Sequence, residues 1–341
     1  MPSWGEILQE VGALAPTDPA ASDTVRRKYI RALQAHTGRA TILYASKWTQ
    51  PGISDPNLLS IVDEDVHGFM EVVRGLGDGG LDLILHSPGG SAEATEAIVS
   101  YLRARFSGIR VIVPQAAMSA ATMLACASDE IVMGLHSSLG PIDPQMLMQT
   151  PLGIRMVPAQ AILDQFDQAQ EDCKNPAKLG SWMPILGQYG PALLVQCQNA
   201  LKLSKHLVKD WLARYMFASL ARRHATMKAA VVARTLADHR RHMSHGRHFD
   251  RALCQSIGFK ITSLEADRKL QDLVLSAFHS TMVTFNMTPA AKIIENHLGR
   301  AFIKIAMQGQ VQLIPQPTRG GKPGSGEQVA PFPPLTAPQK S

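Results

Sequence analysis

Short apolar segments alternate with helical patterns between residues 39 and 145. Val, Ile and Leu dominate the predicted strands, which are 39–48, 80–87, 108–115 and 130–134. Helical patterns fill the intervals, at 58–77, 91–106 and 116–128. Because consecutive parallel strands need a right-handed crossover, this alternation predicts an α/β fold with a mainly parallel sheet.

The rest of the chain divides by composition. We expect an N-terminal helical arm over 1–38, a main domain over 39–265 with a helix-rich part at 158–240, a helical and strand extension over 266–314, and a disordered tail over 315–341. The tail is rich in Pro, Gly and polar residues. Within the helix-rich part, Pro176, Pro184 and Pro191 are expected to mark breaks. We expect the last strand of the main domain to begin near Phe259 to Ile261, after a turn and a short helix.

Composition favours a globular protein of one large domain or two ordinary ones. The 341 residues are 45% hydrophobic and 18% charged. No apolar run reaches the ~18 residues of a membrane-spanning helix, and the N-terminus lacks the apolar core of a secretory signal. The four cysteines form no Cys-x-x-Cys pair, as expected of isolated thiols in a reducing compartment. We therefore expect a cytoplasmic protein, and peripheral contact with a membrane stays open.

Much of the net charge of +6 lies between Arg214 and Arg251. A basic face can bind nucleic acid or anionic lipid, but no nucleic-acid motif accompanies this one, so a solvated helix face is the simpler interpretation. Four histidines at a spacing of three follow Asp238, and they lack the cysteine or carboxylate support of a metal site. We expect no metal, and a structural role for His245 and His248.

The first candidate site is His86-Ser87-Pro88-Gly89-Gly90, at the end of a predicted strand. Ligands of α/β sheets bind outside the carboxyl ends of strands. Glycine amides can approach a bound group closely, and two amides aimed at one point form an anion or oxyanion site. An ordinary strand-to-helix turn is the alternative. No Lys-Ser/Thr follows the glycines, which excludes a phosphate-binding P-loop.

The second candidate site is the corner Met118-Ser119-Ala120, between a predicted strand and a helix of small residues. The hydroxyl of Ser119 would be exposed there, and small neighbours would let a substrate carbonyl come close. The amide of Ala120 could then act together with that of Gly89 or Gly90 on a tetrahedral oxyanion. The alternative is that Ser119 merely caps the helix.

Taken together, these motifs resemble a known family. Ser-Pro-Gly-Gly, a helix, a strand, the Ser-Ala-Ala corner and "ASDEIVMG" resemble the Clp protease subunit and signal peptide peptidase A, which share the ClpP/crotonase fold. "LDLILHSPGG", "MSAATMLACASDEIVMGLHSSLGPIDPQ" and "SHGRHFDRALCQSIGFKI" look most like the serine dehydrogenase proteinases of that class. The resemblance covers about residues 25 to 265.

The resemblance implies a spiral of ββα units with a helical extension, and a serine endopeptidase with Ser119 as nucleophile. It implies an oxyanion hole from Gly89 or Gly90 and Ala120, no cofactor, a peptide or protein substrate, and assembly of copies into a ring. No nucleic acid is expected as a partner. The family name mentions a dehydrogenase, but the chain has no Gly-x-Gly-x-x-Gly fingerprint, so that activity is rejected.

The general base is left open. The Clp subunit carries its histidine about 25 residues after the serine, and here that position is Pro144, beside Asp143. Relatives of signal peptide peptidase A use a lysine some forty to sixty residues after the serine, which brings in Lys174 and then Lys178. A desolvated lysine can lose its proton near neutral pH. His136 is the third candidate, since a loop could fold it back toward Ser119.

Two other classes of function remain. An unclear base would fit a catalytically inactive scaffold or ring subunit, because the same fold also serves acyl-coenzyme A chemistry and inactive subunits. An adaptor that uses the basic segment 214–251 would bind its partner less well as salt increases. A lysine or histidine within hydrogen-bonding reach of Ser119 would favour the peptidase.

Overall fold

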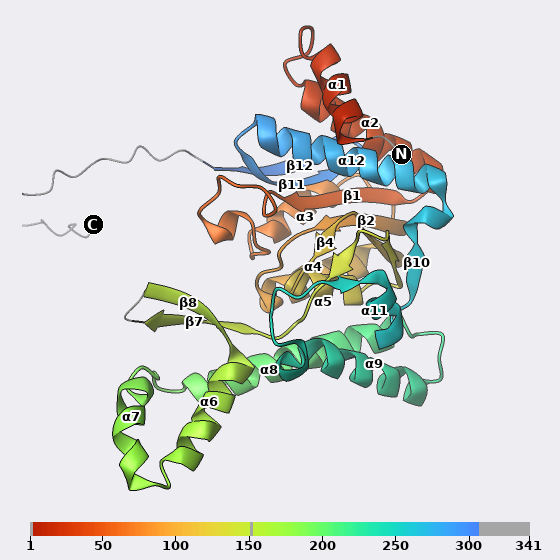
Figure 1. Ribbon diagram of the computed structural model, residues 1–341. Coiled ribbons are helices and arrows are strands. Elements are labelled where there is room, and N and C mark those ends of the chain that lie inside the picture. Colours follow the sequence, from red (N-terminus) through yellow and green to blue (C-terminus); the bar gives the residue numbers. More distant parts are fainter. Residues whose placement is uncertain (1–2, 151–152, 307–341) are drawn as a thin grey trace, which may run out of the picture. The chain divides into compact units, whose positions relative to one another are not determined.

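Seven strands form the central sheet of the computed structural model, which describes residues 3–150 and 153–306. They are β1 (Ala40–Ser46), β2 (Gly80–His86), β3 (Gly108–Val113), β5 (Glu130–Met133), β10 (Ile261–Ser263), β11 (Ala290–Asn296) and β12 (Ala301–Ile305). The order is β10-β5-β3-β2-β1-β11-β12, in which the first five are parallel and the last two are antiparallel (Figure 1). The predicted α/β fold of ClpP/crotonase type, with a helical extension, is confirmed.

Two smaller sheets stand beside the central one. The first has the order β4-β6-β9 and consists of β4 (Ala116–Ala117), β6 (Ser138–Leu139) and β9 (Phe249–Asp250). The second is an antiparallel ribbon of β7 (Gln145–Thr150) and β8 (Gly153–Pro158). It projects from the body of the protein in Figure 1.

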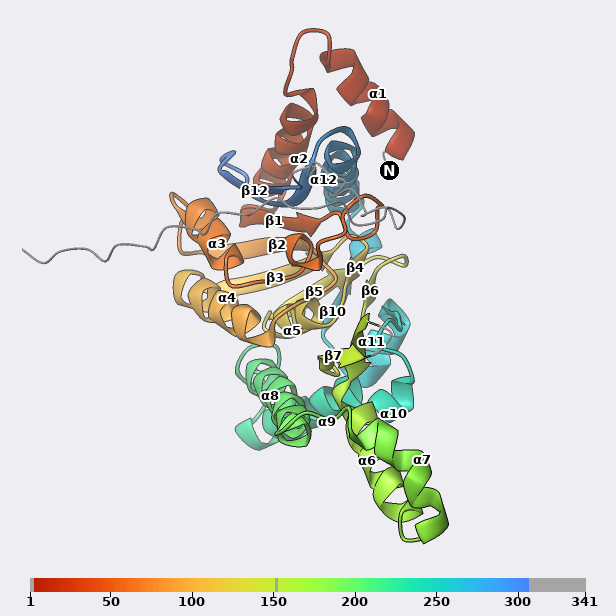
Figure 2. The same cartoon turned by 90° about the vertical axis from the view of Figure 1, so that its left-hand side faces the viewer.

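Helices cover both faces of the central sheet. They are α1 (Trp4–Leu14), α2 (Ala21–Thr37), α3 (Asp65–Val73), α4 (Ala92–Arg105), α5 (Ala120–Cys126), α6 (Ala159–Asp172), α7 (Pro176–Leu186), α8 (Leu193–Arg214), α9 (Arg222–Ala237), α10 (His239–His242), α11 (Arg251–Ile257) and α12 (Arg268–Met287). Two short 3-10 turns, Pro56–Leu58 and Leu264–Ala266, complete the described elements. In Figures 1 and 2, α2 and α12 lie on one side of the sheet, and α3, α4 and α5 lie on the other.

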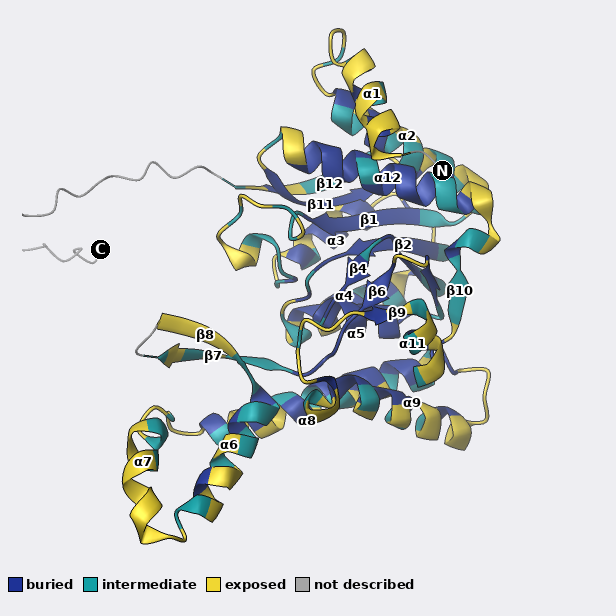
Figure 3. Cartoon of the chain, in the orientation of Figure 1, coloured by how far each residue is buried: buried dark blue, intermediate teal, exposed yellow. Residues whose placement is uncertain are grey.

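The strands are buried on both faces because their side chains alternate between two cores. On β2, Leu83 and Leu85 point into the core formed with α3, α4, α5, α8 and α9, whereas Ile84 points into the core formed with α2 and α12. All three side chains are fully buried. This two-sided burial explains why the strands are almost continuously apolar, and Figure 3 shows the sheet as the most buried part of the chain.

The helix predicted over 58–77 is shorter in the structure, where α3 spans Asp65–Val73. Its expected first turns are diverted toward the Gly-Gly loop: the amide of Ile61 donates to the carbonyl of Gly89 at 2.7 Å, and Ile61 bridges to Gly90 in parallel. A tertiary contact therefore replaces local helix propensity here.

The C-terminal part completes the sheet. Strand β10, expected to be the last, is an edge strand, and α12, β11 and β12 follow it. Strand β11 pairs with β1, so the expected boundary at residue 265 falls within one continuous sheet. Helix α2 of the expected arm packs on α12, and its buried Arg26 forms an ion pair with buried Glu295 at 2.6 Å. The tail expected at 315–341 lies outside the described residues.

The helix-rich segment is confirmed as helical, but its prolines have different roles. Pro176 lies in the first turn of α7, where proline is well tolerated, and Pro191 lies just before α8. Pro184 lies inside α7 and does not end it. Helices α8 and α9 pack against the main core, whereas α6 and α7 form a hairpin that extends away from the sheet (Figure 2).

Candidate active site

The two predicted corners meet at the ends of the parallel strands. Ser87 bridges to Ala117, and the amide of Met118 donates to the carbonyl of Ser87 at 2.9 Å. Gly89 lies so close to the second corner that a β-carbon there would be 2.7 Å from Ser119 Cβ and 2.8 Å from the amide nitrogen of Ala120. Gly89 has a φ of 99°. Both the contact and the backbone angle require glycine at this position.

Ser119 itself has an unusual backbone. Its φ is 52° and its ψ is −121°, a combination that L-residues rarely adopt. The side chain does not cap α5, although Ser119 occupies the N-cap position. Within the part of the chain that the structure describes, its hydroxyl has no hydrogen-bond partner. The hydroxyl is therefore held at a sharp strand-to-helix turn, available to a ligand, as in nucleophile elbows.

Two backbone amides beside Ser119 are also available. Among the described residues, the amides of Gly90 and Ala120 donate no hydrogen bond. The amide of Gly89, by contrast, donates to Ser87 Oγ at 3.2 Å. Gly90 has a φ of 152°, and a β-carbon there would lie 2.2 Å from the carbonyl oxygen of Ile61. Of the two glycines that the sequence offered as oxyanion donors, Gly90 is the one with a free amide.

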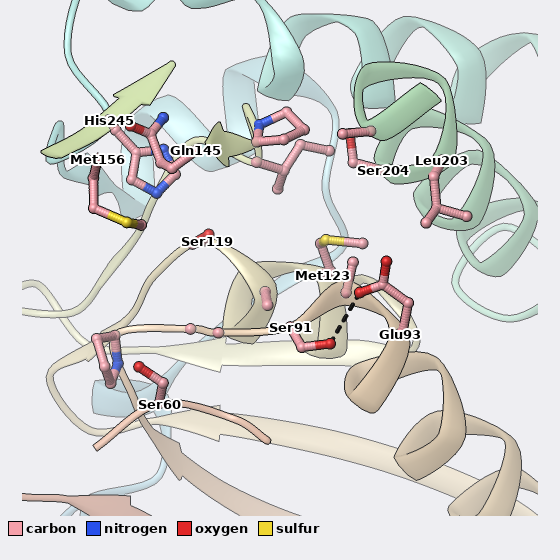
Figure 4. A pocket seen from close by; sticks show the side chains of 18 of the residues that line it. Ser60, Ser91, Glu93, Ser119, Met123, Gln145, Met156, Leu203, Ser204 and His245 are labelled. Atoms are coloured by element: carbon pink, nitrogen blue, oxygen red, sulfur yellow. Dashed lines mark hydrogen bonds between the residues drawn. The ribbon is translucent and has the colours of Figure 1, made fainter. Parts of the chain in front are cut away.

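A cavity of about 530 Å³ opens above this corner. Figure 4 shows several of its side chains. Its lining residues are Ser60, Pro88, Gly89, Gly90, Ser91, Ala92, Glu93, Ser119, Ala120, Met123, Ile142, Pro144, Gln145, Met146, Met156, Ala200, Leu203, Ser204 and His245. They come from the Gly-Gly loop, α4, α5, the β7–β8 ribbon, α8 and the loop that precedes β9.

A histidine that we expected to be structural lines the same cavity as Ser119. His245 is partly exposed, and its Nδ1 lies 2.8 Å from Oδ1 of Asp143, whose side chain is 1% exposed. A carboxylate can only accept, so Nδ1 is the donor in this contact and Nε2 points away from Asp143. Figure 4 shows His245 across the cavity from Ser119. The two side chains do not hydrogen-bond to each other in this structure.

Asp143 is held by more than one donor. His239 Nδ1 lies 2.9 Å from Oδ2, and Gln145 Nε2 donates to the same oxygen at 3.1 Å. Both carboxylate oxygens are therefore occupied, which fixes the plane of the carboxylate and with it the ring of His245.

The structure does not bring the predicted bases to Ser119. Lys174 and Lys178 are exposed at the far end of the α6–α7 hairpin, where they pair with Glu171 and Asp172. Neither lysine lines the cavity. His136 is exposed on the loop after β5, and it does not line the cavity either. The structure therefore places all three candidate bases outside the cavity of Ser119.

The sequence offered little indication that His245 would pair with Asp143 at the site. Asp143 lies beside the position where a histidine was sought, but the imidazole that meets it is 102 residues away along the chain. A loop between α10 and β9 carries it, and only the tertiary fold brings this loop beside Asp143.

Behind the Gly-Gly loop lies a buried polar network. Tyr44 donates to Asp65 at 2.7 Å, and Lys292 Nζ pairs with the same carboxylate oxygen at 2.7 Å. Burial lowers the pKa of Lys292 to about 8, although the neighbouring Asp65 opposes that change. Burial and the Asp65 carboxylate raise the pKa of the Tyr44 phenol well above its usual value. Lys292 also donates to the carbonyl of Ser60, so the network supports the segment that holds Gly90.

The residue that begins this loop, His86, is completely buried. Its ring stands edge-on to Phe278, with centroids 5.0 Å apart, and lies near Trp48. Burial lowers the pKa of His86 from 6.5 to about 3, so the ring is neutral in the folded protein.

Known proteins are similar to this part of the chain. The family of ClpP-like SDH-type serine proteinases matches residues 20–179. The predicted resemblance to the serine dehydrogenase proteinases is thereby confirmed for this segment. The matched residues include Ser119, Gly90, Ala120 and Asp143, whereas His245 lies beyond them.

Two uncharacterized proteins of Methanocaldococcus jannaschii are similar to this chain. One is 41% identical over 151 residues, which are 44% of this chain and 47% of that protein. The other is 40% identical over 86 residues, which are 25% of this chain and 27% of that protein. The chain thus spans about half the length of the first relative and about a quarter of the second.

A solved structure is also similar, a mutant of the 1510-N membrane-bound stomatin-specific protease. It is 14% identical, the match covers 59% of this chain and 74% of that one, and the TM-score is 0.33.

Only two of the four histidines after Asp238, His239 and His245, meet at Asp143. His248 Nδ1 lies 2.7 Å from Ser138 Oγ instead, and His242 bonds to the carbonyl of Thr235. No group of three metal-ligating side chains occurs among residues 3–150 and 153–306. Within the basic segment, Arg214, Arg240 and Arg251 pair with acidic residues. No helix in the described ranges has the length and apolarity to cross a membrane.

Proposed function

We propose that the protein is a serine endopeptidase, with Ser119 as nucleophile, His245 as general base and Asp143 as the carboxylate that orients the base. The single observation that carries the proposal is the arrangement at Ser119. A strained serine with an unbonded hydroxyl lies beside two unbonded amides, those of Gly90 and Ala120, and faces a cavity with a histidine–carboxylate pair.

The chemistry follows from these groups. Ser119 Oγ attacks the carbonyl carbon of the peptide bond while Nε2 of His245 takes its proton. The negative oxygen that forms is stabilised by the amides of Gly90 and Ala120. The imidazolium of His245, stabilised by Asp143, then gives its proton to the leaving amine, and an acyl-enzyme remains. Water, deprotonated by His245, releases the acid and restores Ser119.

In this structure, Ser119 and His245 line the same cavity without a hydrogen bond between them. Catalytic hydrogen bonds are often long in a protein without substrate and shorten when substrate binds. His245 lies on a loop that also contains Met243 at a φ of 62°. The proposal requires this loop to bring Nε2 of His245 to Ser119 when substrate binds.

An inactive scaffold is the second candidate, favoured by this same missing hydrogen bond. A fluorophosphonate probe, which reacts only with an activated serine, separates the two. We expect the wild-type protein to be labelled, and Ser119→Ala and His245→Gln to lose labelling by a factor of about a thousand or more. Asp143→Asn should lose less, since it disturbs the orientation of the base and leaves the nucleophile and the base in place.

Lys174→Ala, Lys178→Ala and His136→Ala are the matched controls, because they remove the other candidate bases. Each should be labelled at the wild-type rate. Absence of labelling in folded wild-type protein, or labelling that survives His245→Gln, would contradict the proposed triad. Folding of every variant is checked by circular dichroism.

We further propose that copies of the chain assemble into a homo-oligomer. The β7–β8 ribbon has one face that carries exposed apolar side chains, Leu147, Ile154 and Met156, and α7 adds the exposed Met183. Such a surface is unusual for a monomer. The four cysteines are free, which supports action in a reducing, cytoplasmic compartment with a peptide or protein as substrate and without nucleic acid. Peripheral membrane contact remains part of this proposal.

A further inference from the structure

One end of the catalytic cavity has apolar walls. Met123 of α5 and Leu203 of α8 face each other there, and Ile142 and Ala200 extend the same lining. Met123 and Ile142 are buried. Figure 4 shows this end on the far side of Ser119 from Met156 and His245. The walls therefore suit the aliphatic part of a substrate side chain next to the bond that Ser119 would cleave.

A polar atom is left without a partner at this end. Ser204 of α8 has 2% of its surface exposed and lines the cavity. Its Oγ is buried and, among the described residues, makes no hydrogen bond. An unpaired buried hydroxyl is unfavourable, and a ligand that hydrogen-bonds to it would recover that cost.

A carboxylate lies at the same end. Glu93, an exposed residue in the first turn of α4, lines the mouth of the cavity, and its Oε2 accepts a hydrogen bond from Ser91 Oγ at 2.9 Å. In Figure 4 its side chain points between Met123 and Leu203. No cation among the described residues forms an ion pair with Glu93, and no lysine or arginine lines the cavity. The end of the cavity thus carries one negative charge that is not balanced.

Apolar walls that lead to a carboxylate and a hydroxyl fit a long basic side chain. Lysine and arginine have an aliphatic stem and a terminal group that only donates. An uncharged aliphatic side chain would use the walls but would leave Ser204 unpaired and Glu93 desolvated.

We propose that this end of the cavity is the specificity pocket, and that it selects a basic residue on the acyl side of the cleaved bond, with Glu93 as the specificity-determining residue. Met123 and Leu203 contact the stem, and Glu93 and Ser204 accept hydrogen bonds from the terminal ammonium or guanidinium. The inference rests on the proposed function, because it requires the acyl group to be attached at Ser119.

Two peptidyl diphenyl phosphonates test the inference. They share a peptide and differ only in the terminal side chain, which is lysine in one and norleucine, its uncharged analogue, in the other. Ser119 Oγ forms a bond to phosphorus as phenol leaves. We expect the lysine reagent to label the wild-type protein about tenfold faster, because a charge-assisted hydrogen bond to Glu93 contributes this much. The ratio should fall as salt increases.

Glu93→Gln should bring the two rates within about twofold of each other, because the charge that distinguishes the two reagents is removed. Glu96→Gln is the matched control, since Glu96 is exposed on the same helix and does not line the cavity. It should keep the wild-type ratio.

The outcomes separate the two proposals. Equal rates for the two reagents in the wild type, or a ratio that Glu93→Gln leaves unchanged, would overturn the inference while fluorophosphonate labelling of Ser119 still supports the peptidase. No labelling of Ser119 by any of the three reagents would overturn the proposed function and the inference together.

Discussion

At the scale of single residues, the site depends on the backbone conformation of Ser119, which could not be predicted from the residue type. Ser119 adopts a positive φ, which costs on the order of 1–3 kcal/mol in a residue other than glycine. The surrounding contacts hold it there: Gly89 packs against Ser119, and the amide of Met123 donates to the carbonyl of Ser119 at 3.1 Å. Such strain is kept where it serves a function.

Ser119→Gly should therefore stabilise the fold while it abolishes activity. Glycine adopts this φ and ψ without strain, but it also increases the conformational entropy of the unfolded chain. We expect the free energy of unfolding to rise by about 1 kcal/mol after both effects are counted. Urea unfolding followed by circular dichroism measures it. Ser119→Ala is the control, because alanine keeps the strain and should stay within about 0.5 kcal/mol of the wild type. Equal stability of the two variants would show that the turn is not strained.

Site residues that lie in short sequence motifs could be predicted, whereas those that meet only through the tertiary fold could not. Gly89, Gly90, Ser119 and Ala120 lie in two short motifs at strand ends, and the structure places the motifs in contact. His245 was assigned a structural role, because its partnership with Asp143 arises only when a distant loop folds against α10 and β6. Lys174 and Lys178 were chosen by their number of residues from Ser119. This spacing does not predict where the α6–α7 hairpin lies relative to the cavity.

At the scale of elements, strand β2 shows how burial couples the site to stability. Its prediction succeeded because a strand buried on both faces is apolar throughout. The one ionisable side chain at its C-terminal end, His86, is enclosed by Trp48 and Phe278. The predicted start of α3 failed because Ile61 pairs with Gly90, which a local pattern cannot anticipate.

His86 should make the fold sensitive to acid. Its pKa is lowered to about 3 in the folded protein, so between pH 6.5 and 3 the unfolded chain binds a proton that the folded chain does not. Stability from this group is fully present above pH 6.5 and decreases as the pH falls. From pH 7 to pH 5 the loss should be about 2 kcal/mol.

Urea unfolding of wild type and His86→Met at pH 7 and pH 5 measures this contribution. We expect the variant to lose about 2 kcal/mol less than the wild type over this interval. His224→Gln, an exposed histidine of α9, should behave as the wild type does. The same loss in His86→Met and wild type would assign the acid sensitivity to other groups.

At the scale of the whole molecule, the ribbon and hairpin that project from the fold are its least buried parts. Strand pairing places Leu147 opposite Met156 and Gln149 opposite Ile154, so the exposed apolar side chains share one face of the ribbon. The other face, with Met146 and Met148, packs toward α6 and α8. A ribbon with both faces apolar is expected to be covered by another copy of the chain.

Leu147→Gln combined with Ile154→Thr should weaken self-association by at least about tenfold, because it removes apolar area from the proposed interface. Size-exclusion chromatography with light scattering over a range of concentrations measures the dissociation. Leu135→Gln changes an exposed apolar residue outside the ribbon and should assemble as the wild type does. A wild-type protein that stays monomeric at micromolar concentration would refute the homo-oligomer.

The pairing of β1 with β11 has a consequence for synthesis of the chain. Ile42 lies opposite Asn296, so one edge of β1 has no neighbour until about 250 further residues have been made. At the usual ~5–20 residues per second, that interval is roughly 10 to 50 s. During it, the apolar edge is open to pairing with other nascent chains, and a chaperone that covers β1 should raise the yield of folded protein more than one that acts after release from the ribosome.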